Sequence, residues 1–266
     1  MVTYYCNADT GDNGNDGSID SPFLTLEYAI DEGSSSDTIY LQNSTAVYDI
    51  TARINFKVLT IEGESTSGAV LDGTSLGVDG CFSFHKGGTT TSYIKNLTFQ
   101  NFTPGNSGLM YTAHPAGVVN LKISDCIFHD IAGVSFSYPL LMQGFGEVEI
   151  TACLFYNLTY GMYILACVNT ILNNTTWYLT NATINPRSIS ASWVELNNNI
   201  LISTTTTVNT CHYLNRETGS NNCVQNITRI DNLTDTIEED PLMIDPANAN
   251  FNLAPDSPCI DTGILI

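Results

Sequence analysis

A six-residue pattern of apolar and polar positions recurs through the middle of the chain. It reads aliphatic, any residue, an Asn-like residue, any two residues and then a large apolar residue. Its copies are residues 94–99, 123–128, 150–155, 172–177 and 196–201. The steps between copies are shorter than the roughly 30 residues that a strand–helix–strand unit needs, and the stretches between them lack a 3.6-residue apolar period. The pattern therefore predicts short strands in a regular repeat.

Repeats of this length can stack as the coils of a parallel β-helix, with neighbouring strands about 4.8 Å apart. Short strands also occur in sandwiches and barrels, but those folds need tight hairpins. After residue 80 no Asn-Gly or Asp-Gly turn lies between two strand runs. We therefore predict an all-β solenoid, a parallel β-helix.

Stacking predicts three columns of equivalent residues. The aliphatic column contains Ile94, Ile123, Ile150, Leu172 and Leu196. The aromatic column contains Phe99, Phe128, Phe155 and Trp177. The polar column contains Asn96, Asp125, Asn174 and Asn198, interrupted by Ala152. We expect the polar column to point inward at a bend, where side-chain amides can pair with backbone groups that the turn leaves free.

Residues 20–32 have the pattern of an amphipathic helix, with Ser21 as the N-cap and Pro22 at the first helical position. One side of this helix would carry Phe23, Leu26, Ala29 and Ile30. The open end of a β-helix needs covering, so we expect this helix to act as a lid. The chain is then a single domain, 1–266, with a cap (1–35), coils (36–235) and a closing segment (236–266).

Both ends of the chain resemble those of pectate-lyase-like right-handed parallel β-helix proteins. At the start, the resemblance rests on Asp16-Gly17-Ser18, Ser21-Pro22-Phe23-Leu24-Thr25-Leu26, Ala29-Ile30 and the strand Thr38-Ile39-Tyr40-Leu41. At the end, it rests on Asp240-Pro241-Leu242, Asp245-Pro246, Phe251-Asn252-Leu253 and Ser257-Pro258-Cys259-Ile260-Asp261-Thr262-Gly263. The resemblance implies a right-handed parallel β-helix with a short N-terminal capping helix. The family includes lyases, hydrolases, adhesins and surface proteins without known activity, so it implies no single function.

Charge excludes several classes of partner. The chain has 8 Lys or Arg against 27 Asp or Glu, which gives a formal net charge of −19. So few cations cannot neutralise a run of phosphates or hold an anionic membrane surface. No apolar run approaches the length of a membrane span. We expect no nucleic acid partner and no direct membrane insertion.

The sequence assigns no catalytic residue. Lyases of the family use an Arg or Lys base, whereas Lys95 and Lys122 do not share a column here. A glycosidase needs two nearby carboxylates. The candidates are Asp125, Asp130, Glu147 and Glu149. His129 beside Asp130 is either an exposed strand pair or a base with its orienting carboxylate.

The acidic loop at residues 9–16 has the composition of a calcium loop but lacks the full EF-hand pattern. Asp9, Asp12 and Asp16 are weak calcium candidates. We otherwise expect no cofactor.

Eight cysteines occur without a CxxC pair, which leaves disulfides or buried thiols. Cys126 and Cys153 share a position on successive coils, about 5 Å apart and within disulfide range. A disulfide is favoured there over two stacked thiols. Cys211 and Cys223 flank an Asn/Gly-rich loop and are expected to close it. The partners of the other four stay open.

Nine Asn-x-Ser/Thr sequons favour a secreted or cell-surface glycoprotein. Asn101 and Asn157 lie two residues beyond the aromatic column and should point outward, so we expect them to carry glycans. Asn96 should point inward and carry none. Asn43, Asn181, Asn226 and Asn232 are further candidates.

These observations favour an extracellular glycosylated β-helix module with a structural or adhesive role, as a unit of a surface protein or fibre. Its expected partners are further copies stacked end to end, other surface glycoproteins, or glycans. The alternatives are a carbohydrate-active enzyme, a hydrolase or lyase, and a lectin-like glycan-binding module. A cleft with paired acids would favour the enzyme.

Overall fold

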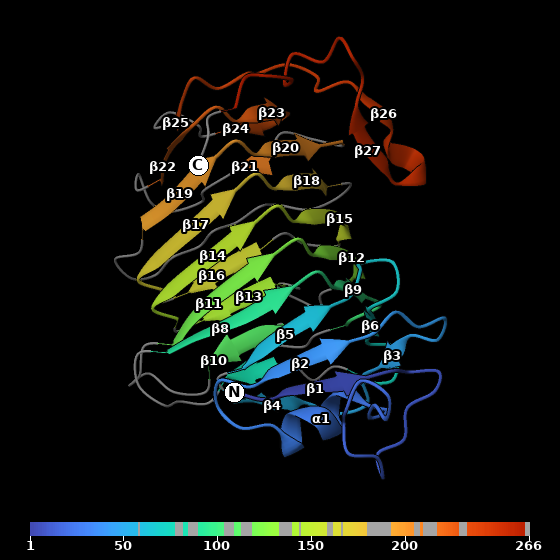
Figure 1. The fold of residues 1–266 in the computed structure, drawn as a ribbon. Coiled ribbons are helices and arrows are strands. Elements are labelled where there is room, and N and C mark those ends of the chain that lie inside the picture. The colour runs from blue at the N-terminus through green and yellow to red at the C-terminus, as the bar shows by residue number, and fades with distance from the viewer. Residues whose placement is uncertain are drawn as a thin grey trace.

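The computed structural model describes residues 1–57, 59–77, 82–84, 90–103, 109–112, 119–132, 140–143, 145–158, 162–165, 167–179, 193–204, 208–209, 217–228 and 233–263. Their strands stack in parallel along one axis (Figure 1). This is the expected right-handed parallel β-helix. Neither helix in the described part of the chain is long and apolar enough to cross a membrane.

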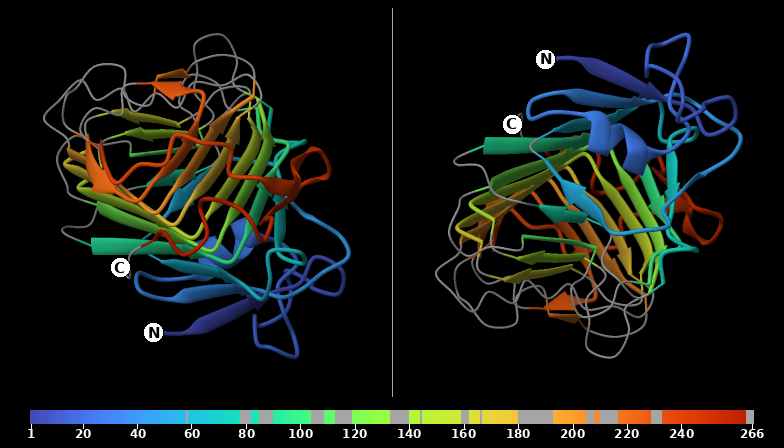
Figure 2. Two further views of the ribbon diagram at one scale, coloured as in Figure 1. Left: turned by 90° about the horizontal axis from the view of Figure 1, so that it is seen from above. Right: turned by 90° about the horizontal axis from the view of Figure 1, so that it is seen from below.

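The largest sheet has ten strands and forms one side of the solenoid (Figures 1 and 2). In spatial order its strands are β1 (Thr3–Cys6), β2 (Thr38–Leu41), β5 (Thr60–Gly63), β8 (Thr90–Lys95), β11 (Val119–Ser124), β14 (Glu147–Thr151), β17 (Asn169–Asn173), β19 (Trp193–Asn197), β22 (Glu217–Ser220) and β25 (Leu233–Thr234). Side chains alternate between the interior and the outer face, as the buried Leu121 and Ile123 on β11 illustrate.

A second sheet of eight strands forms another side. Its strands are β3 (Tyr48–Asp49), β6 (Val70–Asp72), β9 (Thr98–Gln100), β12 (Ile127–Ile131), β15 (Leu154–Leu158), β18 (Thr176–Leu179), β20 (Ile200–Ser203) and β23 (Cys223–Gln225).

Three smaller parallel sheets form the remaining side. They pair β4 (Ile54–Phe56), β7 (Phe82–Phe84) and β10 (Met110–Thr112), then β13 (Leu140–Gln143) with β16 (Met162–Leu165), and β21 (Val208–Asn209) with β24 (Ile227–Thr228).

The interior contains the predicted columns. Register pairs every neighbouring member of the aliphatic column, from Ile94 to Leu196, and all five are buried. In the aromatic column the ring centroids of Phe99 and Phe128 are 4.7 Å apart, those of Phe128 and Phe155 4.9 Å, and those of Phe155 and Trp177 3.6 Å. Both columns are confirmed, and they form much of the core.

The polar column lies at the bend between the two large sheets, but its inward direction was wrong. Asn96, Asp125, Ala152, Asn174 and Asn198 all have left-handed backbone, with φ between 53° and 56°. This conformation reverses the strand alternation, so these side chains are half-buried or exposed. Asn is one of the few residues that adopts it at low cost, which explains the preference for Asn here.

The inward amides occupy the next position along the chain. Asn199 Nδ2 donates to Asn222 Oδ1 (3.0 Å) and to the Leu172 carbonyl (2.8 Å). Asn199 Oδ1 accepts from the Thr175 hydroxyl (2.7 Å), whose oxygen accepts from Trp177 Nε1 (2.8 Å). The buried ladder therefore pairs polar groups along the axis, as buried amides require.

The N-terminal helix is shorter than predicted. Helix α1 spans Leu26–Glu32, and its N-cap is Thr25, whose hydroxyl accepts from the Tyr28 N–H (3.3 Å). Ser21 and Pro22 precede the helix, because Phe23 is in extended backbone paired with β1. Phe23, Leu26, Ala29 and Ile30 are all buried as expected, and α1 lies below β1 at the start of the solenoid (Figure 1).

The closing segment folds back along the outside of the eight-stranded sheet. It contains β26 (Met243–Asp245), the 3-10 helix η1 (Pro246–Asn248) and β27 (Asn250–Leu253), with β26 and β27 antiparallel. This hairpin lies beside β15 and β18 (Figure 1). The Phe251 ring lies 5.0 Å from that of Tyr156 and 5.4 Å from that of Tyr178.

Candidate functional site

Four of the six expected glycosylation sites lie at described positions, and all four are exposed. They are Asn43, Asn101, Asn157 and Asn226. Asn101, Asn157 and Asn226 adopt left-handed backbone at the ends of their strands, with φ from 49° to 58°, which turns each side chain outward. Asn181 and Asn232 lie outside the described residues. Glycan attachment at these positions stays a prediction.

The side-chain amide of Asn96 is engaged in hydrogen bonds, which is a different reason for the expected absence of a glycan than the inward direction predicted from the sequence. The residue is half-buried at the bend, and its Nδ2 donates to the carbonyls of Gly63 (2.8 Å) and Glu64 (3.0 Å). Both amide hydrogens are therefore used, and the expectation that Asn96 carries no glycan stays.

The expected cysteine pairing needs two corrections. Cys126 and Cys153 stack on successive coils but are free thiols, each within sulfur hydrogen-bond distance of a carbonyl of its own coil. Burial raises the pKa of the Cys126 thiol well above its usual range, so the thiol stays protonated. Cys223 pairs with Cys259, because the closing segment returns to β23. The expected partner, Cys211, lies outside the described residues.

The carboxylates of the calcium candidates accept hydrogen bonds from backbone N–H groups. Asp9 accepts from the N–H groups of Thr45 (2.6 Å) and Ala46 (2.8 Å), while Asp12 and Asp16 each accept from the N–H two residues later. In the part of the chain that the structure describes, no group of three or more His, Cys, Asp or Glu side chains could hold a metal ion.

His129 and Asp130 form a close pair on the eight-stranded sheet. His129 Nδ1 lies 2.6 Å from Asp130 Oδ2, and Asn157 donates to the other carboxylate oxygen. The His129 ring stacks on Tyr156, with 4.8 Å between centroids. The His129 side chain is 15% exposed, and a ring nitrogen held by a carboxylate fits both readings of the pair that the sequence left open.

Charged and aromatic side chains lie side by side on the outer face of the ten-stranded sheet. Register places Tyr93 on β8 opposite Lys122 on β11, and Lys122 opposite Glu149 on β14. Lys122 Nζ lies 2.5 Å from Glu149 Oε2 and 3.9 Å from Glu147 Oε1. One ammonium thus bridges two carboxylates that leave β14 on the same face.

A second charged pair adjoins the first. Lys95 Nζ lies 3.9 Å from Glu62 Oε2 on β5 and 5.6 Å from the centroid of the Tyr93 ring. Tyr93 is 37% exposed. We call Glu62, Tyr93, Lys95, Lys122, Glu147 and Glu149 the charged patch; it crosses four neighbouring strands.

The same face continues to an exposed tryptophan. Trp193 on β19 is 55% exposed, and it follows Glu147 and Asn169 in one row across the sheet. Its neighbour Glu195 accepts a hydrogen bond from Asn197 Nδ2 (2.7 Å). Four strand spacings separate β8 from β19, so the two aromatic side chains begin about 19 Å apart along the sheet.

Comparison with known proteins identifies the fold. No protein-family model and no curated protein sequence matches the chain. A rhamnogalacturonan lyase structure matches at a TM-score of 0.52 and 14% identity, over 85% of this chain and 74% of its own. The pectin methylesterase PemA from Erwinia chrysanthemi matches at 0.50 and 13%, over 85% of this chain and 80% of its own. The fold is that of the pectate-lyase-like parallel β-helix proteins. At these identities the likeness concerns the fold.

Within the charged patch, Lys122 forms ion pairs with two carboxylates of one strand. The Glu149 hydrogen bond, opposed in part by desolvation, raises the pKa of Lys122 above its ordinary value, so the ammonium holds its proton and is a poor base. A glycosidase needs one protonated and one ionised carboxyl group. Here one ammonium lies 2.5 Å from a Glu149 oxygen and 3.9 Å from a Glu147 oxygen.

Analysis of the sequence did not predict that the residues of the charged patch lie together. Lys122 precedes its aliphatic column residue and Lys95 follows its own, so they occupy different columns. Positions on either side of a buried strand residue both face outward, which places the two lysines diagonally across β8 and β11. The alternation around Ile94 and Ile123 was the signal that would have located them.

Proposed function

We propose that the chain is an extracellular adhesive module that binds a neutral glycan along the outer face of the ten-stranded sheet. The observation that carries the proposal is the charged patch, with Tyr93 inside it and Trp193 farther along the same face.

The side chains on this face complement the hydroxyl groups and the apolar ring faces of a sugar. Hydroxyl groups both donate and accept hydrogen bonds, so they pair with ammonium donors and carboxylate acceptors alike. Tyr93 is 37% exposed and Trp193 55% exposed, so the accessible part of each ring can pack against the apolar C–H faces of sugar rings. The parallel strands hold these groups at a regular spacing, which suits a repeating polymer.

Charge favours a neutral ligand. The lysines of the patch, Lys95 and Lys122, are each already beside a carboxylate, and the net charge of the chain is −19. An acidic polysaccharide would be repelled by this field, whereas a neutral one would not.

An extracellular location agrees with two features. The Cys223–Cys259 disulfide is of a kind that persists in oxidising compartments, and four sequon asparagines lie exposed. A module of this kind would meet the glycans of other surface glycoproteins.

End-to-end stacking of copies is the weaker form of the adhesive proposal. Helix α1 and Phe23 cover the first coil, and Ile237 pairs with Cys223 at the last one. Both ends would have to uncover these contacts before another copy could add a strand.

A carbohydrate-active enzyme is the second candidate. The two solved structures described above are a lyase and an esterase, and Glu147 and Glu149 lie two residues apart on the same face of one strand, so the patch contains the two neighbouring carboxylates that a glycosidase needs. Incubation with a bound oligosaccharide separates the two proposals, because an enzyme releases new chain ends and a binding module releases none.

Binding to an array of neutral and acidic glycans tests the proposal. We expect neutral glycans to bind, and Tyr93→Ala and Trp193→Ala each to weaken binding about tenfold, or 1.4 kcal/mol. Ile19→Ala is the matched control, because Ile19 is 57% exposed in the N-terminal cap. Preferential binding of acidic glycans, or unchanged binding by both aromatic variants, would overturn the proposal.

A further inference from the structure

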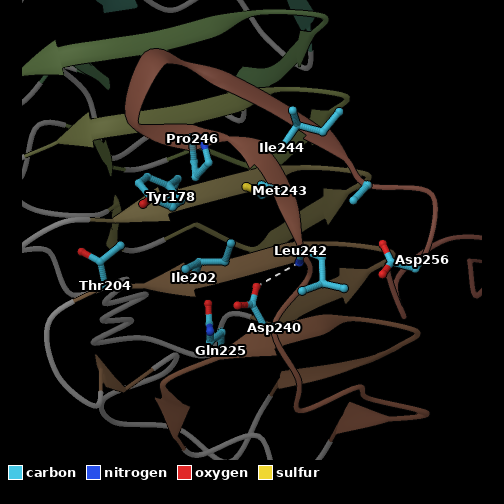
Figure 3. A pocket seen from close by; sticks show the side chains of 11 residues that line it. Tyr178, Ile202, Thr204, Gln225, Asp240, Leu242, Met243, Ile244, Pro246 and Asp256 are labelled. Atoms are coloured by element: carbon cyan, nitrogen blue, oxygen red, sulfur yellow. Dashed lines mark hydrogen bonds between the residues drawn. The ribbon is translucent and has the colours of Figure 1, made fainter.

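A groove separates the closing segment from the eight-stranded sheet (Figure 3). The charged patch belongs to the ten-stranded sheet, on a different side of the solenoid. The volume of the groove is about 550 Å³, within the range of small-molecule sites. Its lining includes Tyr178, Ile202, Gln225, Asp240, Met243 and Asp256.

One wall of the groove is the outer face of the sheet. Tyr178, Ile202 and Gln225 share one row across β18, β20 and β23. Ile202 is 3% exposed although it points away from the interior, because the closing segment covers it. Figure 3 shows Tyr178, Ile202 and Gln225 along this wall, with Asp240 beside Gln225.

The closing segment forms the other wall and is fixed at several points. The Cys223–Cys259 disulfide ties it to β23, the Ser257 hydroxyl donates to the Pro241 carbonyl (2.6 Å), and the Ala254 N–H donates to the Leu242 carbonyl (2.8 Å). Asp240 Oδ1 accepts from the Leu242 N–H (2.9 Å). The groove is therefore preformed, which reduces the entropy cost of binding a ligand.

The lining defines the chemistry of the occupant. Most of the described lining residues are apolar or aromatic, and none of them is Lys or Arg. Asp240 and Asp256 are the ionisable carboxylates of the lining, and Asp240 has one oxygen beyond the one that accepts from Leu242. An apolar surface beside an aromatic ring and a carboxylate that has no Lys or Arg among the described lining residues complements a cation that carries an apolar body.

We propose that this groove binds a small organic cation with an apolar body. The cationic group pairs with Asp240, and the body packs against Tyr178 and Met243. The site is separate from the proposed glycan face, because none of the lining residues that the structure describes belongs to the ten-stranded sheet.

The methyl signal of Met243 gives a direct test by NMR with methyl-labelled methionine. The probe is benzylammonium, compared with neutral benzyl alcohol and anionic benzoate. We expect benzylammonium to shift the Met243 signal at a concentration at least tenfold lower than benzyl alcohol, and benzoate to leave it unchanged. Met1, which is 97% exposed at the N-terminus, serves as the internal reference.

Two charge-matched variants complete the test. Asp240→Asn keeps an oxygen for the Leu242 N–H, and we expect it to remove the tenfold preference for the cation. Asp235→Asn makes the same change of net charge outside the groove, at a left-handed position (φ 50°) that Asn also adopts, and should keep the preference. Equal binding of benzylammonium and benzyl alcohol, or equal effects of the two variants, would overturn the proposal. Neither result bears on glycan binding at Tyr93 and Trp193.

Discussion

Tyr93 and Lys122 lie directly opposite each other on strands β8 and β11, and the ammonium of Lys95 lies 5.6 Å from the centre of the same tyrosine ring. The register of the β-helix pairs Tyr93 with Lys122, although the two residues are 29 positions apart in the chain. It joins an aromatic surface to two charged pairs on the outer face of the ten-stranded sheet, and the proposed glycan site depends on it.

The two tryptophans should differ sharply in their effect on stability. Trp177 is fully buried at the end of the aromatic column, and Trp193 is 55% exposed. We expect Trp177→Ala to lower the free energy of unfolding by about 3–5 kcal/mol, and Trp193→Ala to change it by less than about 0.5 kcal/mol. Chemical denaturation measures both. Similar losses for the two variants would contradict the stacked core.

Ala152 interrupts the column of bend residues and has φ 53°. Because Asn tolerates left-handed backbone better than Ala, we expect Ala152→Asn to raise the free energy of unfolding by about 0.5–1 kcal/mol. Ala152→Val should lower it, since a β-branched residue is strained at positive φ. Thermal or urea unfolding of the three proteins tests the order, and a valine variant as stable as the asparagine variant would contradict the assigned backbone.

Titration should show the link between Lys122 and Glu149. The raised pKa of Lys122 means that the pair stabilises the fold below the unfolded pKa and loses this contribution as pH rises through the folded pKa. We expect Glu149→Gln to lower the pKa of Lys122, followed by NMR of the labelled lysine. Glu62→Gln is the control, because Glu62 pairs with Lys95. An equal response to both variants would contradict the pairing.

The resistance of the closing segment to proteolysis should depend on the Cys223–Cys259 disulfide. In the Cys259→Ser variant the tie to β23 is lost, and we expect faster proteolytic cleavage within residues 240–256, while cleavage of the coils stays slow. Mass spectrometry of the fragments locates the cuts. Cleavage at the wild-type rate would show that Phe251 and the Ser257 hydrogen bond suffice to hold the segment.

The repeat predicted the fold because each coil places the same types of apolar residue at the same spacing. Ile94 and Phe99 recur as equivalent residues, and stacking follows from their spacing. The direction of Asn96 was misjudged because a left-handed residue reverses the alternation of side chains, and the φ value of a bend is not visible in the pattern. The length of α1 was overestimated because Phe23 pairs with β1, a contact made in the tertiary structure.

The candidate site was less predictable for a related reason. The six-residue pattern was aligned on the buried columns, while Tyr93, Lys95 and Lys122 occupy the outward positions between them. The pairing of Cys223 with Cys259 depends on how the closing segment returns across the last coil, and neighbouring sequence carries no signal for that path.

Tryptophan fluorescence during glycan titration tests the central claim most directly. Trp177 is fully buried and Trp193 is 55% exposed, so a ligand on the outer face of the ten-stranded sheet changes the emission of Trp193. With a neutral oligosaccharide selected on the array, we predict a saturable blue shift that disappears in Trp193→Phe. Tyr93→Ala should move its midpoint to about tenfold higher concentration. Saturable binding of the glycan with unchanged emission would contradict the account.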